Sequence, residues 1–389
     1  MERSDVLVLG LGAMGSAAAY QLAKRGARVI GLDRFAPPHD LGSSHGDSRI
    51  TRLAIGEGVA YSPLAMRSHE IWRDIEKETG AELLRRTGGL IMTSPGKTSV
   101  LPVDNFFSTT VAAAEAQGIT HEILDAAEIK RRFPPFNVRA DEIGYYEPEA
   151  GYLKPENCIR AQLALAQKYG AELRTNEKVL GFEPSAHGVR VTTERAAYEA
   201  GRLIVAPGAW MPLLLGARYA KLFTIRRQVL FWFAVDGPIE LFLPGNFPVF
   251  IWEQQGPQLG IYGFPNSGTP SDGVKVATHG FGPITTPDTV DRSVRDEEAA
   301  EMHAAHIAAY LPALNRRCIK AVVCLYTVLP GDQFLIDFLP ESDRIIVASP
   351  CSGHGFKHSA AIGEALAEIA TTGQAHLDIS PFRFSRFGF

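Results

Sequence analysis

The start of the chain contains the pattern that most restricts its fold. An unbroken apolar run, Val6–Leu9, predicts a β-strand buried on both faces of a parallel sheet. Three glycines follow with the spacing G-x-G-x-x-G, and a helix pattern continues over residues 17–23. A second apolar run, Val29–Leu32, leads to Asp33. Strand, glycine turn, helix and strand together predict a βαβ unit that binds a dinucleotide.

Each residue of this motif has an expected physical role. Gly10 permits the tight turn, and Gly12 lets the backbone approach a pyrophosphate at the helix N-terminus. Gly15 lets the helix pack closely on the strand, and Asp33 can accept hydrogen bonds from ribose hydroxyls. A glycine motif alone is weak, but the flanking strand, helix and acid favour a dinucleotide site over a simple glycine turn. The motif does not distinguish FAD from NAD.

Composition excludes several other classes of protein. Of 389 residues, 46% are hydrophobic and 21% charged, which is typical of a folded chain with a large core. The net charge of −4 gives no support to nucleic-acid binding. The four cysteines have no zinc spacing, so no metal site is expected. We find no signal peptide and no apolar run of about 20 residues, and therefore expect a cytoplasmic enzyme without a membrane partner.

The rest of the chain alternates helix and strand patterns. Arg202–Trp210 repeats the order strand then glycine, either as a plain turn or as a backbone that approaches a ligand at Gly208. Between Thr224 and Phe264 short alternating aromatic strands predict a separate antiparallel or mixed sheet. A buried strand over Ile345–Cys351 then leads through glycines into a last helix. Further helices are expected over 61–80, 106–117, 125–132, a segment ending at Tyr169, and 296–310.

Several ordered motifs beyond the first one point to a known family. They are GSSHGDSRITR (Gly42–Arg52), YGFP (Tyr262–Pro265), DGVKVATH (Asp272–His279), AVVCLYT (Ala321–Thr327), FLID (Phe334–Asp337) and SGHGFK (Ser352–Lys357). In this combination and order the chain resembles the monomeric sarcosine oxidase family of flavin amine oxidases, whose relatives include N-methyl-tryptophan oxidase and pipecolate-type oxidases. The resemblance covers nearly the whole chain.

The resemblance gives the expected fold class and its division into domains. We expect an α/β protein (α+β, two domains), with a Rossmann-like FAD-binding domain and an inserted mixed-sheet substrate domain. The FAD-binding domain is predicted to comprise residues 1–88, 150–222 and 325–389, and the substrate domain residues 89–149 and 223–324.

Two cations match the family's clamp for the substrate carboxylate. Arg52 can meet a carboxylate with its planar fork, and Lys357 adds a point charge. Tyr262 is expected in the wall of the same pocket, unless it only packs in the core. Without the motifs, a surface ion pair for Arg52 and a solvated lysine for Lys357 would be the preferred interpretations.

Two further residues match positions that act on the flavin itself. Cys324 corresponds to the cysteine that joins the flavin 8α-methyl group through a thioether, although a buried free cysteine is otherwise a small hydrophobe. Lys275 corresponds to the lysine beside flavin N5 at which oxygen is activated, where a cation stabilises developing superoxide. The alternative for Lys275 is a strand lysine that points to solvent.

The remaining assignments by resemblance concern the flavin ring and the nucleotide. His45 and Arg49 are expected against the ring, and His279 near the substrate amine or as a core histidine. The expected FAD contacts are Gly10, Gly12, Ala13, Met14, Gly15, Asp33, Arg34, Ser43, His45, Arg49, Gly208, Trp210, Cys324, Gly353, Gly355, Phe356 and Lys357.

The implied reaction converts sarcosine or a related N-methyl amino acid, with O2 and water, to the demethylated amino acid, formaldehyde and H2O2. The enzyme would be a monomer. Ser44, Pro350-Cys351 and VLPGDQ (Val328–Gln333) depart from the family pattern, so the accepted N-substituent is left undetermined. A cyclic secondary amino acid such as proline or pipecolate, and N-methyl-tryptophan, stay as alternatives. An NAD(P)-linked dehydrogenase and a non-catalytic flavin-binding protein are the rivals from other classes.

Overall fold

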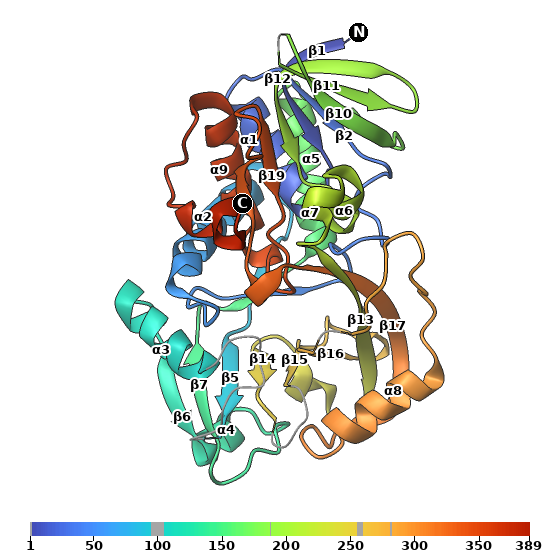
Figure 1. The fold of residues 1–389 in the computed structure, drawn as a ribbon. Helices are drawn as coiled ribbons and strands as arrows, with labels where there is room; N and C mark the ends of the chain where they lie inside the picture. Colours follow the sequence, from blue (N-terminus) through green and yellow to red (C-terminus); the bar gives the residue numbers. More distant parts are fainter. Residues whose placement is uncertain (1, 95–104, 187, 255–259, 281) are drawn as a thin grey trace.

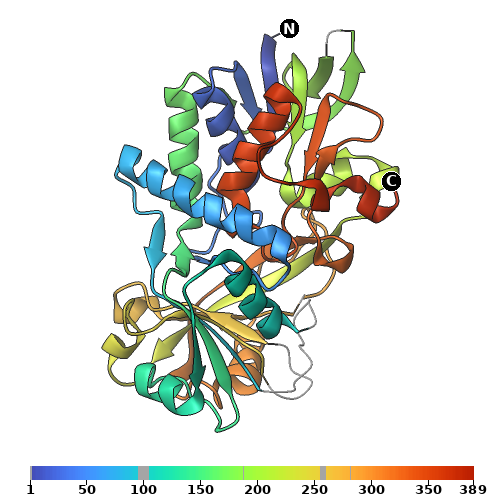
Figure 2. The ribbon, with the colours of Figure 1, turned by 90° about the vertical axis from the view of Figure 1, so that its left-hand side faces the viewer.

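A computed structural model describes residues 2–94, 105–186, 188–254, 260–280 and 282–389. The ribbon has two parts stacked along its long axis, each built on its own large sheet (Figures 1 and 2). The chain passes between the two parts several times, so each sheet is assembled from strands far apart in the sequence. Both termini belong to the upper part in Figure 1.

The first sheet contains the predicted βαβ unit. Its strand order is β10-β11-β12-β1-β2-β9, and β19 pairs with β12 and with β18. β1 lies parallel between β12 and β2, and β19 is parallel to β12, whereas β10, β11 and β18 pair antiparallel. The strands are β1 Glu2–Leu9, β2 Val29–Leu32, β9 Glu172–Arg174, β10 Val179–Ser185, β11 Gly188–Thr193, β12 Ala197–Val205, β18 Ile336–Phe338 and β19 Ile345–Ala348.

Helices cover one face of this sheet. α1 packs against both α5 and α9, and α2 packs against α9. A Cβ on Gly363 would lie 2.2 Å from the Cβ of Ala17, so glycine permits the close approach of α9 to α1. The helices on this face are α1 Ala13–Lys24, α2 Ser62–Thr79, α5 Pro155–Lys168 and α9 Ser359–Thr372. The short helices α6 Met211–Leu214 and α7 Ala217–Ala220 pack with the opposite face, which includes Leu7 and Leu9 of β1.

The second sheet has the order β17-β13-β16-β15-β14-β5-β7-β6. Its pairs are antiparallel apart from β14 with β5, which makes it the mixed sheet that the sequence predicts. The strands are β5 Gly89–Thr93, β6 Glu122–Asp125, β7 Ile143–Glu147, β13 Thr224–Val235, β14 Val249–Trp252, β15 Ile261–Gly263, β16 Val274–Thr278 and β17 Leu314–Val328. The helices α3 Phe106–Gln117, α4 Ala126–Arg132 and α8 Asp296–Met302 accompany it.

A third, small sheet has the order β3-β8-β4. Its strands are β3 Arg49–Thr51, β8 Gly151–Leu153 and β4 Leu84–Arg86. β3 carries the end of the GSSHGDSRITR motif, so this sheet sets where Arg49 and Arg52 project.

Two local predictions were wrong. β13 is twelve residues long rather than short, because its polar first half, including Arg226 and Arg227, pairs with β17 without a register shift. The helix expected over 296–310 ends at Met302 and continues as a π-helical turn to Ile307. At that wider turn His303 bonds to the Leu314 carbonyl, a contact that the local pattern does not encode.

Candidate functional site

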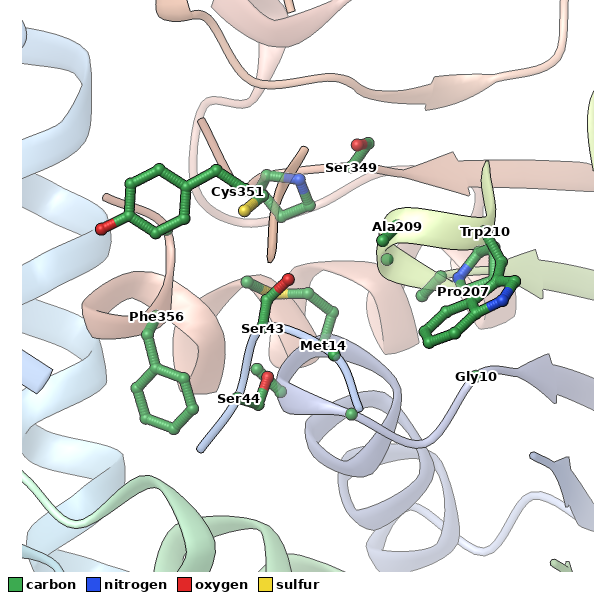
Figure 3. Close-up of a pocket in the computed structure, with 18 of the residues that line it drawn as sticks. Gly10, Met14, Ser43, Ser44, Pro207, Ala209, Trp210, Ser349, Cys351 and Phe356 are labelled. Carbon is green, nitrogen blue, oxygen red and sulfur yellow. The ribbon is translucent and has the colours of Figure 1, made fainter. Parts of the chain in front are cut away.

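A cavity of about 440 Å³ lies at the carboxyl ends of β1, β2 and β12. Its volume is within the usual range for small-molecule sites. In Figure 3, Gly10 and Met14, the Ser43-Ser44 pair, Pro207–Trp210, Ser349–Cys351 and Phe356 surround a common space. Ligands of open parallel sheets bind at this edge, so the cavity is the candidate active site.

The glycine motif forms one end of the cavity. Gly10 has a φ of +85°, and a Cβ there would lie 2.4 Å from the Ala206 carbonyl oxygen. A Cβ on Gly15 would lie 1.6 Å from the Gly10 carbonyl oxygen, which is the close helix-to-turn packing expected of that position. α1 has no side-chain cap and no acid in its first turn, so its N-terminus can accept an anion.

Asp33 also lines this end of the cavity. Its Oδ2 accepts a hydrogen bond from the Leu11 N–H (2.7 Å), and its Oδ1 accepts one from the Phe35 N–H (2.8 Å). Burial raises the pKa of Asp33, and these two backbone donors oppose the rise. The carboxylate therefore ties the glycine turn to the end of β2.

Arg52 and Lys357 meet at another part of the cavity. Their side chains are each only 5% exposed, which excludes the surface ion pair and the solvated lysine considered from sequence. Both pair with one carboxylate: Arg52 Nη2 lies 2.7 Å from Glu57 Oε2, and Lys357 Nζ lies 3.5 Å from Glu57 Oε1. The Arg52 guanidinium also lies 4.9 Å from the centre of the Phe106 ring. Two buried cations thus share one internal carboxylate beside a ligand-sized cavity.

Burial and charge shift the pKa values of this cluster. Burial alone would raise the pKa of Glu57, but Arg52 and Lys357 hold it well below its ordinary value. Burial lowers the pKa of Lys357 to about 8, although Glu57 opposes the shift. Glu57 is therefore ionised at neutral pH, and the charge on Lys357 is within reach of a modest pH change.

Lys275 is buried beneath the cavity rather than pointing to solvent. Its side chain is among the buried charged groups, at 2% exposure, and it does not line the cavity. Its Nζ donates to the carbonyl oxygens of Gly46 and Ser48 (both 2.7 Å) and to Ser48 Oγ (3.3 Å). Burial, followed by Arg49, lowers the pKa of Lys275 well below its ordinary value. The three oxygen acceptors match the three donors of an ammonium group.

Arg49 connects the cavity wall to Cys324. Its Nη2 donates to the Ser43 carbonyl oxygen (3.0 Å) and to Cys324 Sγ (3.4 Å). Burial raises the pKa of the Cys324 thiol, whereas Arg49 lowers it. Cys324 lies one layer behind Ser43 and Arg49, which both line the cavity.

An aromatic wall adjoins the cationic pair. The Tyr262 hydroxyl lies 3.1 Å from that of Tyr326, and the Tyr262 ring packs edge-on against His279 at 5.2 Å. Burial lowers the pKa of His279 to about 4, so its imidazole is neutral at pH 7. Tyr262, Tyr326 and His279 all line the cavity.

Most of the residues predicted for the site come together at this cavity. Its lining includes Gly10, Gly12, Ala13, Met14, Asp33, Arg34, Ser43, Arg49, Arg52, Gly208, Trp210, Tyr262, His279, Gly353, Gly355, Phe356 and Lys357. The predicted residues that lie behind the lining are Gly15, His45, Lys275 and Cys324.

Comparison with known proteins identifies the family. The family model described as "FAD dependent oxidoreductase" matches residues 5–369. The chain belongs to the FAD-dependent oxidoreductase family. This membership favours FAD over the nicotinamide alternative for the nucleotide end of the cavity.

Two relatives narrow this assignment. The chain is 43% identical to a monomeric sarcosine oxidase of Streptomyces avermitilis, over 95% of this chain and 94% of the relative. It is 31% identical to an N-methyl-L-tryptophan oxidase of Yersinia pestis, over 98% of this chain and 99% of the relative. The predicted resemblance to the monomeric sarcosine oxidase family is thereby confirmed.

A solved structure supports the fold. NikD, an amino acid oxidase essential for nikkomycin biosynthesis, superposes with a TM-score of 0.82 at 25% identity. The match covers 98% of this chain and 98% of NikD. The expected Rossmann-like FAD-binding architecture with a mixed sheet agrees with this match.

The cavity residues fit FAD. The uncapped α1 N-terminus suits a pyrophosphate, and Asp33 at the end of β2 suits a ribose. Among the described residues, Ser349 Oγ and His45 Nε2 are buried without a hydrogen-bond partner, and Ser349 lines the cavity. Buried polar atoms that lack partners within the chain are suited to a polar ligand.

Three charged or titratable residues of the site were missed by sequence reasoning. Glu57 pairs with both clamp cations, His354 places Nδ1 3.7 Å from Glu57 Oε1, and Asp288 pairs with Arg34 at 2.8 Å. His354 lies inside the SGHGFK motif, which was a usable signal. Glu57 lies five residues after Arg52, but the partner that brings it into the site, Lys357, is distant in sequence.

The described residues hold neither a membrane-spanning helix nor a cluster of metal ligands. Within those residues, no helix is long and apolar enough to cross a membrane. The same part of the chain holds no group of three or more histidine, cysteine or acidic side chains that could bind a metal ion.

Proposed function

We propose that this chain is an FAD-dependent oxidase of N-methyl amino acids, with sarcosine as the leading substrate. The observation that carries the proposal is the buried pair Arg52 and Lys357, which shares a cavity with the nucleotide motif. Two desolvated cations favour one small carboxylate. The names of the relatives, sarcosine oxidase and N-methyl-tryptophan oxidase, supply the class of amine.

FAD, when bound, accepts a hydride equivalent from the substrate and passes electrons to O2. In the proposed reaction sarcosine, O2 and water give glycine, formaldehyde and H2O2. Arg52 and Lys357 hold the substrate carboxylate and so orient the N-methyl carbon. Tyr262 and Tyr326 exclude water from the amine, and neutral His279 can accept a hydrogen bond from it. Lys275, buried and held by three oxygen acceptors, stabilises the negative charge that develops during O2 reduction.

Product analysis separates this proposal from its alternatives. With sarcosine we expect formaldehyde and H2O2 in equal amounts, measured in one reaction. Turnover of proline or pipecolate with H2O2 but without formaldehyde, and no turnover of sarcosine, would assign the cyclic alternative. A preference for N-methyl-tryptophan over sarcosine would indicate the N-methyl-tryptophan alternative, with a larger substrate pocket. Absence of H2O2 with all four amines would contradict an oxidase.

The pKa of Lys357 predicts a pH dependence of carboxylate binding. Butyrate, the carbon isostere of sarcosine, should bind about tenfold or more weakly once pH rises through about 8, because Lys357 loses its charge there. The dissociation constant is measured from flavin absorbance changes between pH 6.5 and 9.5. In Lys357→Met, binding should be weak throughout and the step at about pH 8 absent. A step that persists in this variant would remove Lys357 from the clamp.

We propose that the flavin is bound covalently through Cys324. Burial raises the pKa of the Cys324 thiol, and the hydrogen bond from Arg49 Nη2 to its sulfur opposes that rise, which supports the thiolate that attachment needs. After acid precipitation, flavin colour should stay in the protein pellet, and in Cys324→Ser it should appear in the supernatant. Cys351→Ser is the matched control, since that thiol lines the cavity itself. Colour lost from the pellet in Cys351→Ser, and retained in Cys324→Ser, would reverse the assignment.

The division into an FAD-binding domain (residues 1–88, 150–222 and 325–389) and a substrate domain (residues 89–149 and 223–324) is also a proposal. It is supported by the two large sheets, whose strands fall mainly within these respective ranges. β17, at Leu314–Val328, crosses the proposed boundary at residue 324. A monomeric state and a cytoplasmic location stay predictions.

A further inference from the structure

The segment between β16 and α8 is anchored at both of its ends to β13. We refer to residues 283–295 as the crossing segment. At its start, Pro283 O accepts from the Arg227 N–H (3.0 Å), and the Thr285 N–H donates to Ile225 O (2.9 Å). At its end, the Arg227 guanidinium donates to the carbonyl oxygens of Asp291 (2.8 Å) and Ser293 (2.7 Å). Both ends of the crossing segment are therefore held by the second sheet.

The middle of the crossing segment reaches the first sheet's part of the molecule. In Figure 1 it rises from the level of α8 toward α6. Asp288 Oδ1 accepts hydrogen bonds from Arg34 Nη1 (2.8 Å) and Trp210 Nε1 (3.0 Å). Arg292 Nη2 donates to the Leu41 carbonyl oxygen (2.7 Å). Three contacts thus join the segment to loops that follow β2 and β12.

These contacts lie at the nucleotide end of the cavity. Arg34 and Phe35 directly follow Asp33, and Asp288, Arg34, Phe35 and Trp210 all line the cavity. The Arg34 guanidinium lies 5.3 Å from the centre of the Phe35 ring and 5.9 Å from that of Trp210. The two rings are 5.4 Å apart. The carboxylate therefore joins a cation and an indole that are already stacked together.

The exposure of this cluster indicates what it does. The side chains of Arg34 and Asp288 are 33% and 45% exposed, so their ion pair by itself stabilises the fold little. Its position is more informative, since it closes a connection between two parts of the chain beside the cavity. A ligand in the cavity would dissociate faster if this connection opened.

We propose that the crossing segment is a clasp that retains the adenosine end of FAD, with Asp288 as the positioning residue that keeps it closed. The proposal rests on FAD as the cofactor of this cavity. Asp33, at the end of β2, is the expected ribose partner, and the clasp contacts the two residues after it. Opening the clasp requires both hydrogen bonds to Asp288 to break, together with the one from Arg292 to the Leu41 carbonyl oxygen.

The test measures FAD release, not activity. In a Cys324→Ser background, which leaves FAD held without a thioether, release is followed by the rise in flavin fluorescence after dilution. Asp288→Ala should release FAD about tenfold faster, the effect of losing hydrogen bonds to a charged acceptor. Asp291→Ala is the matched control: this acid lies in the same segment, and its carboxylate accepts from Ser293. It should release FAD within twofold of the parent.

FMN, which lacks adenosine, tests where the clasp acts. Asp288→Ala should leave the dissociation constant of FMN unchanged. Equal weakening of FMN and FAD, or release from Asp291→Ala as fast as from Asp288→Ala, would overturn the proposal. If Asp288→Ala does not fold, Asp288→Asn replaces it, and we expect a smaller increase in the rate of FAD release. An unchanged rate in this variant would count against the clasp. If sarcosine reduces the flavin of the parent but the Asp288 variants release FAD no faster than the parent, only the clasp is overturned. If the parent takes up no FAD, both proposals are overturned.

Discussion

Replacing Lys275 by methionine should slow reoxidation of the reduced flavin by O2 about 10²- to 10³-fold, while anaerobic reduction by substrate changes by less than about tenfold. This is the size of effect seen when one preorganised electrostatic group is removed from a site where charge develops. Lys275 suits such a role because its Nζ is buried and held by the carbonyl oxygens of Gly46 and Ser48. Methionine keeps most of the apolar contact and removes the amino group.

Stopped-flow absorbance resolves the two half-reactions. Lys320→Met is the matched control, because Lys320 and Lys275 both lie over the Trp232 ring, at 4.6 and 5.3 Å. Lys320 is exposed and pairs with Asp47, so its loss should leave both half-reactions within about twofold of the parent. Equal losses in reduction and reoxidation for Lys275→Met would show a structural role and remove Lys275 from oxygen activation.

Replacing Arg52 by alanine should weaken butyrate binding by about 2–5 kcal/mol, a factor of about 30 to several thousand. The guanidinium is buried and already bonded to Glu57, so its removal takes away a desolvated charged donor and leaves Glu57 with Lys357 alone. The dissociation constant follows from the flavin absorbance change on titration. Arg73→Ala is the control, since this arginine pairs with Glu76 on α2 and does not line the cavity.

A second variant keeps the Arg52 prediction testable if the single change destabilises the fold. Arg52→Gln keeps a hydrogen-bond donor toward Glu57 and removes only the guanidinium charge, while Lys357 still pairs with Glu57, so no buried charge is left without a partner. We expect this variant to fold and still to bind butyrate weakly. Parent-like affinity in either variant would show that Arg52 does not hold the substrate carboxylate.

The nucleotide half of the site could be predicted because its signals are local. Gly10, Gly12 and Gly15 lie within six residues of one another, between a strand and a helix that each have a clear apolar pattern. The close contact of Gly15 with the Gly10 carbonyl needs no information from elsewhere in the chain. The motifs found by resemblance then placed most of the remaining lining residues in one cavity.

What sequence reasoning missed depends on contacts between distant segments. Asp288 joins the site only because the crossing segment returns to Arg34, 254 positions away. Glu57 belongs to the site because it pairs with Lys357, which is 300 positions away. The polar first half of β13 becomes a strand through its ladder with β17, which no periodicity within it indicates. Ion pairs between distant segments cannot be predicted from any short window of the sequence.

The most direct test of the account is anaerobic titration of the purified flavoprotein with sarcosine, followed by visible absorbance. We expect the oxidised flavin bands to bleach fully and to return when O2 is admitted. Bands that stay unchanged with sarcosine, proline, pipecolate and N-methyl-tryptophan alike would contradict an oxidase of secondary amino acids and leave a protein that binds FAD without using it.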